Sequence, residues 1–171
     1  MAEIVKAYRQ SVGATRFVGK RYTNKDRGPN GMFGIRWEEW GKNGWFDLLK
    51  KQNDGRLRGT YEESDAAIGL MREEGGNFDN FEYWIGFFMP VNTAVPEGFQ
   101  YVDFPPSELG VCWLYGKEGE IYGQEAKCLE RLEKEGFEIT TDWCFERYVS
   151  ARIDMPDDKG NVIIDICFYI K

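Results

Sequence analysis

One stretch of the chain places a carboxylate and a phenol two residues apart among large aromatic side chains: Trp143-Cys144-Phe145-Glu146-Arg147-Tyr148-Val149-Ser150. Apolar and polar residues alternate here, which predicts a strand in which Glu146 and Tyr148 share one face. A poorly hydrated aromatic setting disfavours an ionised carboxylate, and a bound cation offsets that cost through Coulomb attraction and cation–π contact. The same desolvation raises the pKa of a carboxyl group and improves it as a general acid–base near neutral pH. Glu146 is therefore a candidate pocket floor or catalytic group; the alternative is a surface acid paired with a Lys or Arg.

The 171 residues include no histidine. This excludes Ser-His-Asp and Cys-His catalysis, imidazole bases and histidine metal sites, so any catalysis has to use carboxylates, Tyr, Cys or Lys. The four cysteines form no CxxC pair, and their spacing matches no zinc module. No Walker-type loop is present, and no GxGxxG opens a helix after a strand. We expect no metal and no cofactor.

The net charge of −7 disfavours binding to a polyanion, and the densest basic run, residues 20–27, is short. We therefore expect no direct contact with nucleic acid. The N-terminus has no apolar core of signal-peptide length, and no later run is long enough to span a membrane. These features favour a cytoplasmic protein with reduced thiols that does not associate with membranes. The length fits a single domain.

Hydrophobic periodicity and turn residues divide the chain into elements. Residues 1–14 are expected to form an N-terminal arm or short helix that breaks at Gly13, and residues 91–108 a loop. Gly41 and Gly44 indicate a break, or close packing, within the first long helix. We predict strands over 16–22, 65–72, 81–89, 109–115, 143–150 and 162–170, and helices over 32–48 and about 118–136.

The order of these elements is strand–helix–strand–strand, repeated once. The half-repeats cover about residues 15–90 and 101–171, and together they form one domain over 15–171. This order predicts an α+β fold with pseudo-twofold symmetry, in which an antiparallel sheet carries two helices on one face and a ligand groove on the other.

Alternation along the last strand divides its residues between the two faces. One set should meet the helices: Val162, Ile164, Ile166, Phe168 and Ile170. The more polar set should face the groove: Ile163, Asp165, Cys167 and Tyr169. In 143–150 the same alternation assigns Phe145, Arg147 and Val149 to the helix side, and Glu146 and Tyr148 to the groove. A buried Arg147 would need a partner.

Further groove candidates come from the aromatic and acidic residues of the other strands. The candidates for the wall of the ligand groove are Trp113, Trp84 and Tyr148, with Trp143 behind them. Each is equally well explained as an ordinary core residue. Glu82 is a second candidate acid that ranks below Glu146. Cys167 is more typical of a small buried hydrophobe than of a nucleophile. The tryptophans of the first helix are expected in the core: Trp37, Trp40 and Trp45.

The duplicated order, the Phe-Glu-Arg-Tyr run at 145–148 and the closing Ile163-Ile164-Asp165-Ile166-Cys167-Phe168-Tyr169-Ile170 resemble the GyrI-like small-molecule-binding domain. Similar effector-binding domains are fused to AraC-type and MerR-type multidrug regulators of transcription. The resemblance covers roughly 15–171 in a stand-alone form. It implies an aromatic groove at the pseudo-twofold axis, with a central glutamate matching Glu146 that pairs with planar cations. A closing-strand acid and aromatic would fall near Asp165 and Cys167, so this chain keeps the acid and replaces the aromatic with Cys.

Three functions are compatible with this resemblance. The first is a small-molecule-binding protein that senses or sequesters aromatic, amphipathic, cationic drugs or toxins. The second is a cofactor-free hydrolase that confers toxin resistance, in which Glu146 activates water against a strained, cyclopropane-containing DNA-alkylating compound. The third and weakest is an inhibitor that contacts a protein such as gyrase. The protein partner, if one exists, is not identified by the sequence.

Overall fold

The computed structural model describes residues 1–53, 55–59 and 61–171 of the chain. Within these residues one antiparallel sheet has the strand order β1-β6-β8-β7-β3-β4-β2-β5. The strands are β1 Glu3–Val12, β2 Thr15–Thr23, β3 Ala67–Glu73, β4 Phe81–Met89, β5 Gln100–Phe104, β6 Ser107–Gly116, β7 Ile139–Tyr148 and β8 Val162–Ile170. The α-helices are α1 Gly34–Asn43, α2 Trp45–Lys50, α3 Glu118–Ile121, α4 Glu125–Lys134 and α5 Ser150–Ile153. The predicted α+β class is confirmed.

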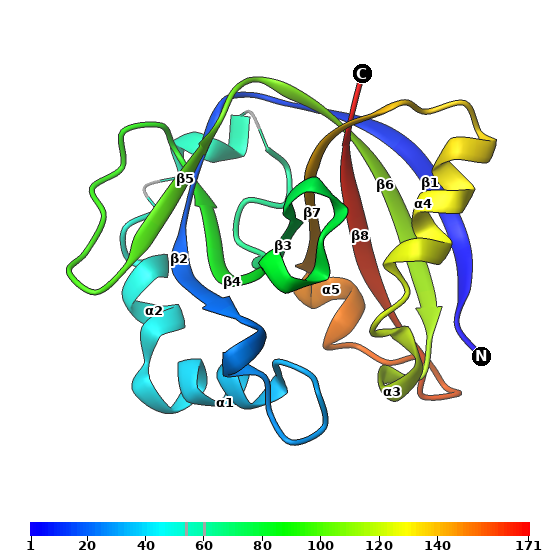
Figure 1. Ribbon diagram of the computed structural model, residues 1–171, viewed down its shortest axis with the longest axis horizontal. Helices are drawn as coiled ribbons and strands as arrows, with labels where there is room; N and C mark the ends of the chain where they lie inside the picture. The colour runs from blue at the N-terminus through cyan, green and yellow to red at the C-terminus, as the bar shows by residue number, and fades with distance from the viewer. Residues whose placement is uncertain (54, 60) are drawn as a thin grey trace.

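The strand order is symmetric about the central pair β3 and β7. Exchanging β1 with β5, β2 with β6, β3 with β7 and β4 with β8 reverses the order and leaves it unchanged. The two halves lie side by side, with β2, β4, α1 and α2 in one and β6, β8, α3 and α4 in the other (Figure 1). The leading strands are exchanged: β1 pairs with β6 of the second half, and β5 pairs with β2 of the first.

Two short links curl this sheet. β1 ends at Val12 and β2 begins at Thr15, although five strands separate them in the sheet. Six strand spacings of about 4.8 Å would place them roughly 29 Å apart in a flat sheet, whereas a two-residue link spans at most about 11 Å. The link from Phe104 to Ser107 imposes the same constraint on β5 and β6. The outer strands must therefore approach one another at this end of the molecule.

The two faces of the curled sheet have different cores. One hydrophobic cluster draws on all eight strands and includes Phe17, Phe88 and Phe145; this is the inside of the curl, here called the concave face. On the other face, the helix face, there are two clusters. Trp40 and Leu49 pack on the first half, and Cys128 and Leu132 pack on the second. Cys144 of β7 packs against both clusters, so they meet near the central strands β3 and β7; this junction between the halves on the helix face is here called the seam.

Several predicted elements occur as expected, and others were wrong. The first long helix breaks at Gly44, which has a φ of 68° and lies between the end of α1 and the start of α2. Residues 1–14 are not an arm or helix, because Glu3–Val12 forms the edge strand β1. The expected loop over 91–108 contains β5, and Val149 and Ser150 lie beyond the end of β7. The inner strands β4 and β8 are buried on both faces, whereas the edge strands β1 and β5 carry several exposed residues.

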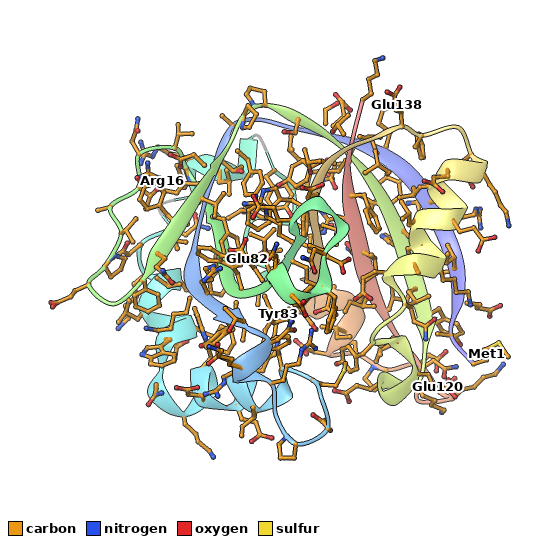
Figure 2. All side chains as sticks on the ribbon, in the orientation of Figure 1. Met1, Arg16, Glu82, Tyr83, Glu120 and Glu138 are labelled. Carbon is orange, nitrogen blue, oxygen red and sulfur yellow. The ribbon has the colours of Figure 1, made fainter. Side chains whose placement is uncertain are left out.

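The chain start is tied to the second half. The Met1 ammonium group forms an ion pair with Glu120 Oε2 at 2.9 Å (Figure 2). None of the helices in the described part of the chain has the length and apolar character needed to cross a bilayer.

Candidate ligand site at the seam between the two halves

Glu146 lies at the centre of the sheet, on the helix face. It is opposite Gly69 of β3 and Ile166 of β8, and it is 6% exposed. Its Oε2 atom accepts hydrogen bonds from Tyr83 Oη at 2.9 Å and from Tyr148 Oη at 2.8 Å. Among the described residues no group donates a hydrogen bond to Oε1. One carboxylate oxygen is therefore held by two phenols, and the other has no hydrogen-bond donor among the described residues.

Gly69 gives this arrangement its space. A Cβ atom at this position would lie 2.5 Å from Tyr83 Oη and 2.7 Å from Glu146 Oε2, distances that real Cβ atoms do not tolerate. The absence of a side chain on β3 thus allows the phenol and the carboxylate to meet across the central strand pair.

Helix α1 covers the site through Trp37. Its indole Nε1 donates a hydrogen bond to Tyr83 Oη at 2.9 Å, and its ring lies 4.6 Å from that of Tyr148 at an angle of 57°. Tyr83 Oη accepts from Trp37 and donates to Glu146, so it is fully engaged. Trp37 therefore forms the roof of the site, and a ligand that reaches Glu146 has to contact or displace it.

The electrostatics of the seam favour a positive charge. Burial raises the pKa of Glu146 to about 7; the Glu125 carboxylate at the start of α4 raises it further, while the two phenol hydrogen bonds oppose the shift. Burial also raises the pKa of Glu125. Burial first, and then the Glu146 charge, raise the pKa values of Tyr83 and Tyr148 well above the usual range. Within the described residues Glu146 forms no ion pair with Lys or Arg. The described residues therefore supply no positive counterpart to its negative charge.

Of the eight predicted site residues, only Glu146 and Tyr148 are together. The other six are on the concave face: Glu82, Trp84, Trp113, Trp143, Asp165 and Cys167. Strand pairing settles this, since Asp165 faces Arg147 and Cys167 faces Phe145, both of which alternate with Glu146 along β7. The predicted groove thus combined residues from two faces. The helix-side assignment was correct for the apolar set of β8 and wrong for Phe145 and Arg147.

On the concave face the predicted acids have partners of their own. Arg147 and Asp165 are both 0% exposed, with Arg147 Nε 2.8 Å from Asp165 Oδ2. Arg147 also donates to Gln10 and Tyr61, and Arg152 binds both oxygens of Asp165. This network pairs the charge of the buried Arg147 through Nε and Nη1, while Nη2 has no hydrogen-bond partner among the described residues.

The other concave-face candidates are core or structural residues as well. Trp84 and Trp113 belong to the concave core, and Trp143 packs edge-on against Phe104. Glu82 accepts from Arg21 and lies 3.7 Å from Arg72. Its neighbour Tyr83 belongs to the helix-face cluster of the first half (Figure 2 labels both residues).

The sequence interpretation missed Tyr83, Trp37, Glu125 and Gly69. Tyr83 is next to Trp84 in β4, so the predicted tryptophan lies on the concave face and the tyrosine on the helix face. The helical spacing correctly placed Trp37 on the inward side of α1, yet it could not indicate that this side lies over a carboxylate. Gly69 and Glu125 carry no local signal of a site.

A separate groove of about 800 Å³ lies at the end of the molecule where the two short links meet. Its lining includes Ser11, Pro105, Glu108 and Thr141. The Glu108 carboxylate accepts from Ser11 Oγ at 2.6 Å and lies 3.8 Å from Arg9 Nη1, so a cation already faces its charge. The volume of this groove favours it as a ligand site, whereas the unpaired charge of Glu146 favours the seam. We assign the candidate site to the seam, because burial of an unpaired carboxylate requires a compensating interaction.

The fold has solved relatives. A search of protein-family models finds no match. A search of curated protein sequences finds none either. The structure of SAV2435 bound to tetraphenylphosphonium matches with a TM-score of 0.64 and 16% identity, covering 98% of this chain and 94% of that one. The EcmrR C-terminal domain matches with a TM-score of 0.61 and 11% identity, covering 97% of each chain. A hydrolase from Listeria innocua matches with a TM-score of 0.54 and 15% identity, covering 97% of this chain and 92% of that one.

At such low identities these matches show the shared fold alone.

Proposed function

We propose that this protein is a GyrI-like domain that binds aromatic organic cations at the seam, with Glu146 as the charged floor. The observation that carries the proposal is the buried Glu146 carboxylate, which has two tyrosine donors on one oxygen and no cationic partner among the described residues. A ligand cation would supply the missing charge, and the surrounding rings of Trp37, Tyr83 and Tyr148 would supply cation–π contacts. The tetraphenylphosphonium bound to SAV2435 supports this class of ligand by analogy of fold.

Calorimetric titration with tetraphenylphosphonium tests the proposal, with the neutral triphenylphosphine oxide as the matched ligand. We expect saturable binding of the cation and at least tenfold weaker binding of the neutral compound. Glu146→Gln keeps the shape of the side chain and removes its charge, and should weaken cation binding roughly 10- to 100-fold. The control is Glu133→Gln, which removes the same charge from an exposed residue of α4. Equal affinities of wild type and Glu146→Gln would refute the site.

Hydrolysis of a strained electrophile is the second candidate function. It is favoured by the Glu146 pKa of about 7, which suits general acid–base catalysis at neutral pH. In this reaction Glu146 would accept a proton from water as the water oxygen bonds to a cyclopropane carbon. The ring C–C bond breaks, and the other carbon takes up the proton that Glu146 accepted, which restores the carboxylate. Mass spectrometry of a cyclopropane-containing toxin after incubation would show the gain of one water with wild type and none with Glu146→Gln. Recovery of unchanged toxin from both would exclude this activity for that compound.

A further inference from the structure

A continuous aromatic stack leads from the protein surface to the seam. Phe78, which is 58% exposed, stacks on Phe81 with ring centroids 6.0 Å apart and an angle of 27°. Phe81 stacks on Phe33 at 6.1 Å and 27°, and Phe33 stacks on Tyr83 at 4.4 Å and 3°. Tyr83 in turn donates to Glu146. The outermost ring is thus connected to the buried carboxylate through three ring stacks and one hydrogen bond.

A cation already occupies the outer part of this stack. The Arg27 guanidinium carbon lies 4.6 Å from the ring centre of Phe33, 5.2 Å from that of Phe78 and 4.9 Å from that of Phe81. These distances are within the range of cation–π attraction. Desolvation lowers the pKa of Arg27.

The polar contacts of Arg27 are few and neutral. Its Nε donates to Asn24 Oδ1 at 2.8 Å, and its Nη1 donates to the Gly31 carbonyl at 2.8 Å. No carboxylate of the described chain forms an ion pair with it. Asn24 also holds the Phe78 carbonyl at 2.7 Å, which fixes the segment 74–80 beside the turn at 24–26 (Figure 1). Releasing Arg27 would therefore break two hydrogen bonds that water can replace, and no ion pair.

We infer that the faces of Phe33, Phe78 and Phe81 form an outer cation site, which Arg27 fills in the resting protein and at which an aromatic organic cation docks before it reaches Glu146. This inference rests on the proposed function, since it concerns the route to the same site. The ligand displaces Arg27, exchanging one cation on the rings for another. Phe33 belongs to the outer site and stacks directly on Tyr83 of the inner one, so the two sites share a wall.

Stopped-flow tryptophan fluorescence with tetraphenylphosphonium measures the association rate. Phe78→Leu keeps an apolar side chain and removes the aromatic face, and should lower that rate about 2- to 5-fold. Its dissociation rate should fall by a similar factor, so that the equilibrium affinity changes by less than about twofold. Arg27→Gln empties the outer site and should raise the association rate about 3- to 10-fold. Lys25→Gln removes an equal charge from an exposed side chain of the same turn and is the control.

Unchanged association rates in Phe78→Leu would overturn the inference. An acceleration by Lys25→Gln equal to that of Arg27→Gln would also overturn it, because long-range repulsion would then explain both. If Arg27→Gln fails to fold, Phe78→Leu still decides, since its side chain is largely in solvent. Failure of the proposed function has a different signature, namely cation binding that is absent or insensitive to Glu146→Gln.

Discussion

Glu146 and Arg147 are consecutive residues of β7, yet their side chains are buried on opposite faces of the sheet. Arg147 is neutralised on the concave face by Asp165, 2.8 Å away. Glu146 is left on the helix face with hydrogen-bond donors and no positive charge from the described residues. The strand therefore separates two charges that are adjacent in sequence, and the seam keeps an unbalanced carboxylate.

Cation affinity should depend on pH through Glu146. Because only the ionised carboxylate attracts a cation, the affinity for tetraphenylphosphonium should rise about tenfold per pH unit below pH 7 and level off above it. Tetraphenylphosphonium is a permanent cation, so the ligand itself does not titrate. Calorimetry at several pH values between 5 and 8.5 would measure this, and Glu146→Gln should give a flat profile. A wild-type profile as flat as that of the variant would contradict the assignment.

Stability should show the opposite dependence on pH. The folded-state pKa of Glu146 is about 7, above its ordinary 4.5, so the native protein binds more protons than the unfolded chain between these values. Wild type therefore loses stability relative to Glu146→Gln as pH rises through this window, by up to about 3 kcal/mol above pH 7. Urea denaturation of both proteins at pH 4.5 and 8 would test this. If the free energies of unfolding of wild type and Glu146→Gln differ by the same amount at both pH values, the carboxylate is solvated.

Replacing Gly69 should disrupt the site from beneath. The added Cβ of Gly69→Ala meets Tyr83 Oη and Glu146 Oε2, so we expect a loss of roughly 1–3 kcal/mol in stability and at least tenfold weaker cation binding. Gly41→Ala in α1 adds the same methyl group where no atom lies within 4 Å, and should be neutral or stabilising. Thermal denaturation and titration of both variants would distinguish a local clash from a general effect of losing a glycine.

Glu125 should tune the carboxylate at the seam. Its charge helps to raise the pKa of Glu146, so Glu125→Gln should move the midpoint of the affinity profile to lower pH. At pH 8 the same variant should bind tetraphenylphosphonium roughly 2- to 10-fold more weakly, because one attractive charge is lost. Glu133→Gln on the same helix serves as the control. A midpoint that stays in place would show that Glu125 does not act on Glu146.

Asp165 should act in folding and not in binding. Asp165→Asn leaves the buried Arg147 without its charge partner and should cost about 3–5 kcal/mol of stability. Below its own melting temperature the variant should bind tetraphenylphosphonium within about twofold of wild type, since the residue is on the concave face. If the folded Asp165→Asn variant binds tetraphenylphosphonium much more weakly than wild type, Asp165 belongs to the binding site after all.

The elements were predictable because their signals are local. Apolar runs bounded by turn residues and Pro90 located β4 and β8 at their observed bounds, and the glycine pair in the first helix indicated the break at Gly44. The edge strands β1 and β5 were not predictable in this way, because their pairing is non-local and their outer edges are unpaired. Alternation assigns the residues of a strand to two faces, but it does not say which face meets the helices.

The site shows the same limit. Glu146 and Tyr148 were found because they are two residues apart in one strand. Tyr83 and Gly69 approach Glu146 only through the register of β3 between β4 and β7, which is set by the whole sheet. Phe145 is apolar and was therefore expected under the helices, but it is buried in the core of the concave face. Two buried faces give a strand such as β7 no polar side to reveal its orientation.

The exchange of β1 and β5 makes each half incomplete when alone. A protease cut within 90–99 would release one fragment whose β2 lacks its outer neighbour and another whose β6 lacks its own. Each fragment would carry the strand that the other needs, so the two pieces should recombine in solution and only poorly persist apart. The duplicated halves are therefore mutually dependent, and the protein should unfold as a single cooperative unit in spite of its internal repeat.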